Sequence, residues 1–559
     1  MEVLIFLCVL TGICFLAYLL GLRDQKVAEK LLVEKLKRDF GKAPLREYKE
    51  DDLDHLPGYY LKHPVKFQID DTTWNDLNMD GVFARMNYCL SATGEEYLYY
   101  LLRTPSHSGI AFEFEKQIEF FRNNHDARRA YQVIFARIGR KIRYSIYDYI
   151  DYLDKADNVS NRSHYLMLFL MGLAIVESFF NFTVGFTAFV VLTLVNIFRY
   201  FTTKSEIEPY LRTYSYIMKV IQSVDYFDKA RFPELEKDID AMKEAAKDMK
   251  DFVRGSYILM SPGRMNSGGN PIEMILDYLR MSTHIDIIKF NKMYKVVMGH
   301  KESLDKILTI TGRLEAEISI ACFRESVKED FCLPEFVSDD KGYCASGLSH
   351  PLIENCVKNS IDTSKGLLIT GSNASGKSTF LKTCAVNAIL AQSCNTVLAK
   401  EYRAPYFRIY SSMALKDDIF GGDSYYIVEI KSIKRIIDAA KDKGSKVLCF
   451  VDEVLRGTNT VERIAASTQI LKSFFDAGVL CFAATHDIEL TVLLKDVFDI
   501  YHFEGAVTDN DVHFDYEIKS GPAINRNAIK LLGVMGYDEK IVDDARNLAE
   551  HFLSTGTWN

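Results

Sequence analysis

Two parts of the chain are apolar over lengths typical of membrane spans. The first runs from Val3 to Leu22 without a charged residue and is followed by Arg23 and Lys26. A bilayer core takes about 20 helical residues, and basic residues favour the cytoplasmic side of a span. Residues 1–22 therefore predict a transmembrane anchor whose N-terminus lies outside. A cleaved signal peptide fits less well, because no positive charge precedes the apolar run.

The second apolar part lies between Tyr165 and Phe198, where Glu177 is the single charged residue. It is too long for one membrane helix and fits two shorter arms, at about 165–180 and 182–201. Basic residues flank both ends, which would place both ends in the cytoplasm. The pattern predicts a transmembrane hairpin at 165–201. A buried helical hairpin of a soluble domain remains the alternative.

Apolar residues elsewhere in the first 344 positions have the spacing of helices. Residues 23–69, rich in mixed charge, predict a charged linker helix that leaves the membrane. Residues 70–344 predict a helical core and lever-like domain that contains the hairpin. Gly, Pro and Asn at 261–270 predict a loop, which leaves 210–260 and 271–322 as two long helices of a rod-like hairpin.

The pattern changes after residue 345. Short apolar runs alternate with helical stretches from there on, at 366–370, 446–452 and 478–485. Such alternation is typical of an α/β domain built on a mostly parallel sheet. The predicted fold class is therefore multidomain. An α-helical region with transmembrane helices precedes an α/β domain at 345–520, and a helical segment at 521–559 follows it.

Composition narrows the class of protein. The chain has 559 residues, 26% charged and 48% hydrophobic, with a mean hydropathy of -0.05, which excludes a disordered chain and a chain that is apolar throughout. Its formal net charge is -8, whereas a dedicated nucleic-acid-binding protein is typically basic. The eleven cysteines include no CxxC pair and no cluster with zinc spacing. Reduced thiols, and a cytosolic setting for most of the chain, are favoured.

A glycine-rich loop follows the apolar run at 366–370 and precedes a helical stretch. It matches GxxxxGK[ST] in its required context, and comprises Gly371, Ser372, Asn373, Ala374, Ser375, Gly376, Lys377, Ser378 and Thr379. Backbone N–H groups of such a loop wrap phosphates, and the helix N-terminus adds partial positive charge. Lys377 is expected to contact the β- and γ-phosphates of ATP, and Ser378 to offer its hydroxyl to Mg²⁺.

Polar residues end the two later apolar runs. Asp452 ends the run at 446–452, and Glu453 follows it. Buried carboxylates at this position would be costly unless they held a metal or a water. Asp452 is the expected Mg²⁺ ligand, and Glu453 the expected base or water-positioning residue. His486 follows the third run and is expected to reach the γ-phosphate, with a structural histidine as the alternative. Lys377, Glu453 and His486 are thus the predicted catalytic residues.

These motifs, in this order, resemble those of the MutS family of DNA mismatch repair proteins, within the ABC ATPase class. TGSNASGKST at 370–379 resembles the family's TGPNMGGKST, and DEVLRGTNT at 452–460 resembles its DEIGRGTST. Ala484-Thr485-His486 resembles the family's ATH switch. Two further segments also match, Ser349–Leu352 and the stretch SYYIVE at 424–429, which resembles STFMVEM.

The chain departs from the family's motifs at Ser372, Ala374 and Ser375, and again at 461–463, where Val-Glu-Arg replaces an Asp-Gly. The resemblance extends more weakly outside the motifs, to 74–105, 314–326 and 525–549. It therefore covers most of 70–555.

The resemblance implies a Mg²⁺-dependent ATPase that acts as a homodimer. In this family the phosphate loop of one subunit meets a signature serine of its partner, and Ser424 is the matching residue here. The terminal helices, here within 521–559, help to dimerise. ATP would act as a clamp between subunits, and hydrolysis would reset it. The predicted location is the inner or cytoplasmic membrane, with the ATPase domain in the cytoplasm.

The resemblance to the MutS family leaves DNA binding open. Between the anchor and the core there are about 50 residues, too few for the family's mismatch-reading domain, and the expected lever tip at 261–270 carries only Arg264 as charge. The sequence Phe-Glu-Phe-Glu at 112–115 is interpreted as helix surface. Two hypotheses follow: an ATP-gated clamp that binds mismatched or structured DNA, or a membrane-tethered clamp that acts on a protein or membrane partner.

Overall fold

The structure is a computed structural model. It describes residues 23–558 except 25, 47, 50–52, 109–111, 141–143, 155–159, 255–277, 339–340, 373–374, 414–424, 443, 508–511 and 524–527. The expected anchor at 1–22 and the expected loop at 261–270, with Arg264, lie outside the described residues.

The chain divides into two compact units. A helical unit comprises the described chain up to Pro64, then Asn87–Tyr100 and Lys116–Cys322. An α/β unit comprises Val65–Met86, Leu101–Glu115 and the described chain from Phe323 onward. The chain is thus helical in its N-terminal region and mixed α/β in its C-terminal part, as the sequence predicts.

The helical unit begins with a helix over 26–39, within the predicted charged linker. Its further helices are α2 (Pro57–Lys62), α5 (Ala92–Arg103), α6 (Phe112–Asn123), α7 (His125–Ile138), α8 (Ile146–Asp154), α9 (Arg162–Phe180), α10 (Phe182–Lys229), α11 (Glu236–Asp248), α12 (Lys250–Val253), α15 (Ile285–Gly299) and α16 (Lys301–Val327). Rings of α7 and α10 form part of its core. Phe227 lies 5.1 Å from Tyr131 and 5.4 Å from Phe135 between ring centroids, and all three are buried.

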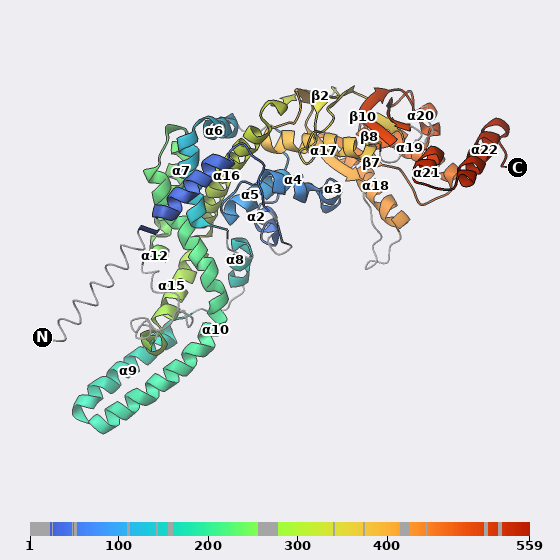
Figure 1. The fold of residues 1–559 in the computed structure, drawn as a ribbon. Helices are drawn as coiled ribbons and strands as arrows, with labels where there is room; N and C mark the ends of the chain where they lie inside the picture. The colour runs from blue at the N-terminus through green and yellow to red at the C-terminus, as the bar shows by residue number, and fades with distance from the viewer. Residues whose placement is uncertain are drawn as a thin grey trace. The chain divides into compact units, whose positions relative to one another are not determined.

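Helices α9 and α10 form the predicted helical hairpin, and Figure 1 shows them side by side. Asn181 joins them and caps α10, because its side chain accepts a hydrogen bond from the N–H of Val184. A Cβ at Gly185 would lie 2.2 Å from the backbone N of Ser178, so this glycine lets the two helices approach closely.

Both arms of the hairpin are long and apolar enough to cross a membrane by length and composition, over Arg162–Phe180 and Phe182–Ser205. Only 17% and 11% of their apolar windows are buried within the chain, so the arms are not a buried core hairpin of the described structure. Large apolar side chains are exposed along both arms, among them Leu166, Phe169, Phe179, Phe180, Phe182, Phe186, Leu194 and Phe198.

The prediction of two uninterrupted long helices at 210–260 and 271–322 is wrong. The first stretch breaks after Lys229 and resumes in the short 3-10 helix η2 (Pro233–Leu235), followed by α11 and α12. Pro233 has no N–H to continue the α10 ladder. In the second stretch, α15 ends at Gly299 and α16 begins at Lys301, with His300 between them.

The α/β unit contains two sheets. Its helices are α3 (Asp71–Asp76), α4 (Met79–Met86), η3 (Lys328–Asp330), α17 (Lys377–Cys394), α18 (Tyr425–Lys441), α19 (Thr460–Asp476), α20 (Glu489–Leu493), α21 (Ala528–Val534) and α22 (Glu539–Thr555). Its strands are β1 (Glu335–Phe336), β2 (Tyr343–Leu348), β3 (Asn359–Thr363), β4 (Leu367–Thr370), β5 (Glu401–Ala404), β6 (Phe407–Ser412), β7 (Lys446–Asp452), β8 (Leu480–Ala484), β9 (Asp499–Val507) and β10 (Val512–Ser520).

The larger sheet has six strands in the order β10-β9-β4-β8-β7-β6. All neighbouring pairs are parallel except β9 and β10, which confirms a mostly parallel sheet. The three apolar runs of the sequence correspond to β4, β7 and β8. The smaller sheet, β1-β5-β2-β3, mixes parallel and antiparallel pairs.

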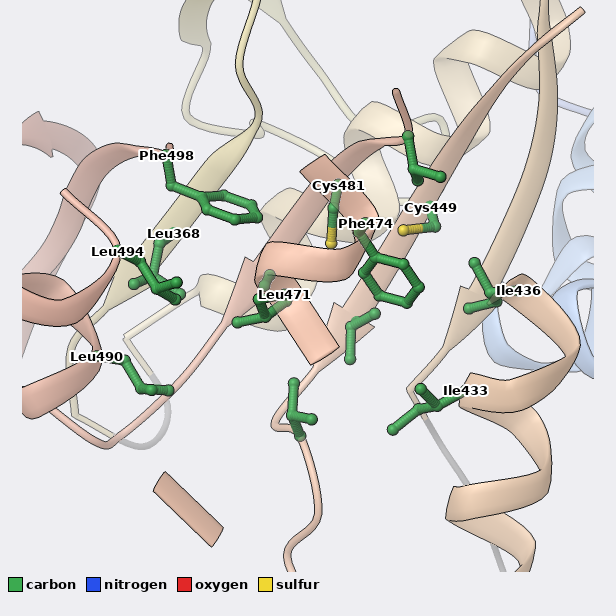
Figure 2. Close-up of a cluster of buried hydrophobic side chains, with 14 of the residues drawn as sticks. Leu368, Ile433, Ile436, Cys449, Leu471, Phe474, Cys481, Leu490, Leu494 and Phe498 are labelled. Atoms are coloured by element: carbon green, nitrogen blue, oxygen red, sulfur yellow. The ribbon is translucent and has the colours of Figure 1, made fainter. Parts of the chain in front are cut away.

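Alternate residues of the parallel strands face two different layers. Cys449 of β7 and Cys481 of β8 belong to a buried cluster with Ile436 of α18 and Phe474 of α19, and Figure 2 shows these side chains converging. The helix α17 is buried over nearly all its length and packs on β7 and β8 as well. The nine described cysteines are free thiols, in keeping with the predicted reduced state.

Candidate nucleotide site

The three sequence motifs meet at one edge of the large sheet. In the parallel register, Ala484 at the end of β8 pairs with Ile369 of β4 on one side and with Asp452 of β7 on the other. The carboxyl ends of β4, β7 and β8 therefore lie side by side, where open α/β sheets bind ligands. The residues that follow these strands are the glycine-rich loop, Glu453 and His486.

The glycine-rich loop turns sharply between β4 and α17. Gly371 and Gly376 have φ of +143° and +106°, a region that favours glycine. A Cβ at Gly371 would lie 2.5 Å from the carbonyl oxygen of Phe503, so a side chain there would clash with backbone. Asn373 and Ala374 lie outside the described residues, and Thr379 lies in the first turn of α17.

Lys377, the first residue of α17, folds back over this loop. Its Nζ donates to the carbonyl oxygens of Gly371 and Ser372, at 2.7 and 2.8 Å. Burial of the ammonium lowers the pKa of Lys377 to about 8, although the nearby carboxylates of Asp452 and Glu453 oppose that shift. The lysine is thus held at the loop with little water around its charge, where a phosphate would be a strong partner.

The two predicted Mg²⁺ ligands are already in contact. Ser378 Oγ donates a hydrogen bond of 2.5 Å to Asp452 Oδ2. A hydroxyl and a carboxylate oxygen are ligands that Mg²⁺ accepts alongside phosphate oxygens. The loop also contains a buried hydroxyl, Ser375 Oγ, that has no hydrogen-bond partner among the residues that the structure describes. This donor set and the glycine turn fit a phosphate group together with Mg²⁺.

Glu453 occupies a left-handed backbone position, with φ of +63°. Its Oε1 lies 2.8 Å from His486 Nε2, and its Oε2 lies 2.7 Å from Arg456 Nε. Burial alone would raise the pKa of Glu453, but the hydrogen bond with His486 and the charge of Arg456 outweigh it and lower the pKa. The carboxylate is therefore held ionised next to the phosphate loop.

Three side chains at this site were not predicted as functional from the sequence. Arg456 pairs with Glu453. Glu429 accepts hydrogen bonds from the backbone N–H groups of Leu455 and Arg456, the first at 2.6 Å, and so fixes the turn after β7. Arg463 forms a bidentate pair with Asp487, at 2.5 and 2.9 Å. A signal for Arg463 existed, because it lies where the sequence departs from the MutS pattern.

A pocket of about 460 Å³ opens beside the loop. It is lined by Gly376, Thr379 and Phe380 from the loop and α17, by Phe503 and Tyr516 from β9 and β10, and by residues 353–357. Thr379 thus faces this pocket, and the aromatic rings offer surfaces on which a planar base could stack. Of its lining, the sequence predicted Gly376 and Thr379 as parts of the phosphate loop, and the resemblance at Ser349–Leu352 lies next to residues 353–357.

Two other sequence expectations have a structural outcome. Ser424 lies outside the described residues, and α18 begins directly after it. The interpretation of the sequence Phe-Glu-Phe-Glu at 112–115 as helix surface is wrong for its described side chains. Phe114 is buried, and Glu115 forms a bidentate pair, at 2.7 and 2.9 Å, with the fully buried Arg324.

The C-terminal part of the chain is similar to known proteins. Residues 367–553 match the family model for MutS domain V. The DNA mismatch repair protein MutS of Natronomonas pharaonis is 33% identical over 296 residues, which are 50% of this chain and 34% of that protein. MutS of Thermus thermophilus is 30% identical over 204 residues, 36% of this chain and 25% of the relative. The DNA mismatch repair protein MutS 2 of Haloarcula marismortui is 26% identical over 303 residues, 49% of this chain and 32% of the relative.

These matches confirm the resemblance to MutS proteins for the C-terminal half of the chain, where residues 367–553 match MutS domain V. The chain spans about a third of the length of the curated relatives it matches most extensively.

Proposed function

We propose that the chain is a Mg²⁺-dependent ATPase of the MutS kind, which works as a membrane-bound homodimer. The observation that carries the proposal is the convergence of three groups at one sheet edge. These are the ammonium of Lys377, the contact between Ser378 and Asp452, and the carboxylate of Glu453 held by His486.

Each of these residues has a distinct part in hydrolysis. Lys377 exchanges its two carbonyl partners for phosphate oxygens and so positions the phosphates. Ser378 and Asp452 would hold Mg²⁺, which when bound neutralises phosphate charge. Glu453 orients the attacking water and accepts its proton, and His486 holds Glu453 in place. Arg456 pairs with the second oxygen of Glu453. This ion pair must break before that oxygen can accept a proton.

The direct test of the nucleotide site is equilibrium binding of radiolabelled ATP to the detergent-solubilised full chain. Lys377→Ala should abolish measurable binding. Lys441→Ala is the matched control, because Lys441 is an exposed lysine of α18 that pairs with Asp438. ATP affinity unchanged in Lys377→Ala would contradict the proposed site.

Dimerisation is proposed from the family resemblance and from the end of the chain. α21 and α22 pack on each other and leave apolar side chains exposed, among them Met535, Tyr537 and Ile541. Exposed apolar surface of this kind is typical of a protein interface. A composite site predicts complementation between two inactive chains. Mixed dimers of Lys377→Ala and Ser424→Ala chains contain one site with an intact loop and an intact serine, and should regain ATP hydrolysis.

Either variant alone should remain inactive. If the mixture of Lys377→Ala and Ser424→Ala is as inactive as its components while mixed dimers demonstrably form, the signature serine does not act across the dimer.

Membrane attachment through α9 and α10 is proposed from their exposed apolar faces. At 1.5 Å per residue, the 19 residues of α9 span about 28 Å, close to a hydrocarbon core of about 30 Å. Deletion of 1–22 should leave the protein in membranes after carbonate extraction, because the hairpin remains. A fully soluble deletion product would refute the hairpin as a membrane element.

The substrate beyond ATP is proposed to be DNA, as the names of the curated relatives indicate for those proteins. The test is a mobility shift with duplex, mismatched and branched DNA, at low and high salt, with ATP or ADP. A salt-sensitive shift is expected, since phosphate contacts dominate protein–DNA affinity. No shift at low salt with either nucleotide would favour the second candidate, a clamp on a protein or membrane partner, which the apolar hairpin motivates.

A further inference from the structure

Two adjoining cavities lie on the helical unit, apart from the nucleotide site. The first, of about 480 Å³, is formed by the helix over 26–39, the segment 40–46 and the ends of neighbouring core segments. The second, of about 540 Å³, lies between the end of α7 and α10. Leu90 and Arg140 line both cavities, so the two share a wall. Each has the size of a small-molecule site.

The lining of both cavities is strongly basic. Lys35, Arg38, Lys42, Arg46 and Arg140 line the first cavity, where Asp39 is the single acidic lining residue. Among the described residues, the second is lined by Arg137, Arg140 and Lys219 and by no acidic residue, although Arg137 pairs with Glu29 at 2.8 Å. A chain of net charge -8 thus concentrates positive charge at one concave place, which attracts anions.

Arg46 and Arg140 are held in position by one buried carboxylate. The carboxylate of Glu95, 1% exposed, forms a hydrogen bond with Arg46 and lies 3.3 Å from Arg140 Nε. Burial would raise the pKa of Glu95, but the contacts of His55, Arg140 and Arg46 outweigh it, lower the pKa and keep the group ionised. One carboxylate thus orients two guanidinium groups and leaves a net positive wall.

In the described part of the chain, Arg140 forms an ion pair with Glu95 but no hydrogen bond through its Nε. This nitrogen is buried. A buried donor without a partner costs free energy, and an anion at the shared wall would supply acceptors. The segment that closes the first cavity is itself anchored, because Tyr88 donates a hydrogen bond of 2.8 Å to the carbonyl oxygen of Lys42.

We propose that these two cavities form a binding site for a small soluble anion that carries two phosphate groups, or a diphosphate, centred on Arg140. Arginine forks match phosphate oxygens, and Lys35, Lys42 and Lys219 provide further charge on either side. All residues that line the two cavities belong to the helical unit, whereas the nucleotide site belongs to the α/β unit, so the proposed anion does not occupy the nucleotide site.

A membrane lipid is the other source of the same phosphate chemistry, and the geometry of α10 disfavours it. The apolar span ends at Ser205, and Lys219 lies about 21 Å further along the same helix at 1.5 Å per residue. A lipid phosphate lies at the membrane surface and would fall well short of the cavity. A soluble ligand has no such restriction.

The test uses the full chain in detergent with Lys377→Ala, so that the phosphate loop contributes no affinity, and inorganic pyrophosphate as the probe in isothermal titration calorimetry. We expect saturable binding of pyrophosphate, at least about tenfold tighter than of orthophosphate, because only pyrophosphate can engage both sides of Arg140. Lys42→Ala and Lys219→Ala should each weaken binding by about tenfold, and Arg140→Gln by more. In the otherwise wild-type chain, Lys42→Ala and Lys219→Ala should leave basal ATP hydrolysis unchanged.

Lys247→Ala is the matched control, since Lys247 is an exposed lysine of the same unit that pairs with Glu244 outside both cavities. The proposal is overturned if pyrophosphate does not bind, if it binds no tighter than orthophosphate, or if Lys42→Ala and Lys219→Ala bind like the control. Binding to vesicles that contain phosphatidic acid, lost in Lys42→Ala without any binding of pyrophosphate, would also overturn it and assign the site to a lipid.

Discussion

Glu453 and His486 follow different strands, yet Oε1 of the glutamate lies 2.8 Å from Nε2 of the histidine. Two features of the fold bring them together. The parallel register pairs Asp452 with Ala484, and the N–H of Glu453 donates to the carbonyl oxygen of Ala484 at 2.9 Å. The contact fixes the direction of the carboxylate at the mouth of the phosphate loop, which is what a residue that positions water needs.

Loss of this contact should impair turnover more than binding. In His486→Ala, Glu453 keeps its charge partner Arg456 but loses the group that orients Oε1. We expect the turnover number to fall by about 100-fold and the ATP dissociation constant to change by less than about threefold. His300→Ala, at an exposed histidine between α15 and α16, is the matched control. Unchanged turnover in His486→Ala would make the histidine structural.

ATP affinity should depend on pH in the alkaline range. The pKa of Lys377 is lowered to about 8 by burial, so the free protein loses this positive charge as pH rises through 8. Below that pH, affinity should be constant. Above it, the dissociation constant should rise by up to about tenfold per pH unit, because the phosphates bind the protonated lysine. Titration calorimetry with ADP between pH 7 and 9.5 measures this, and a flat profile contradicts it.

Leu455 combines a strained backbone with a buried side chain. It has φ of +62° where the MutS motif has glycine, and its side chain belongs to the buried cluster that contains Cys449 and Cys481. Leu455→Ala should cost about 2–5 kcal/mol through the lost burial. Leu455→Gly should be more stable than Leu455→Ala by about 1 kcal/mol, because glycine tolerates this φ.

Leu471→Ala and Leu471→Gly serve as the control pair. Leu471 is fully buried in α19, where glycine is about 1 kcal/mol less favourable than alanine. The thermal unfolding midpoint should therefore be higher for Leu455→Gly than for Leu455→Ala. At the control position it should be higher for Leu471→Ala than for Leu471→Gly. The same ranking at both positions would contradict the backbone argument.

The ion pair of Arg463 and Asp487 should act on the segment that carries His486. Arg463 belongs to α19, and its bidentate contact holds the residue next to the histidine. We expect Arg463→Ala to lower the turnover number by about tenfold with little change in KM. Lys472→Ala, on the same helix, should have no effect. Partial rescue by the swapped pair Arg463→Asp with Asp487→Arg would show that the pairing itself matters.

The elements that carry the phosphate chemistry could be predicted from the sequence because each combines a local pattern with a required neighbour. An apolar strand, a glycine turn and a helix follow one another at 367–394, and buried strands end in Asp452 and in Ala484. The hairpin arms could be predicted in the same way, because Glu177 is the single charged residue between Tyr165 and Phe198.

Other features depend on contacts between distant parts of the chain. Asp76 accepts hydrogen bonds from Ser411 Oγ and from the N–H of Met413, at 2.7 and 2.9 Å, across more than 300 residues of sequence. No periodicity indicates such a pair. The break before Pro233 differs, because a proline is itself a local signal for the end of a helix.

The central claim is that Glu453 performs hydrolysis at a site that binds ATP through Lys377. The most direct test is Glu453→Gln, with ATP binding and steady-state hydrolysis measured on the same preparation. The substitution removes the negative charge and keeps the shape of the side chain. We predict that ATP binding is retained while hydrolysis falls by at least about 100-fold. Hydrolysis undiminished in Glu453→Gln would contradict the assignment.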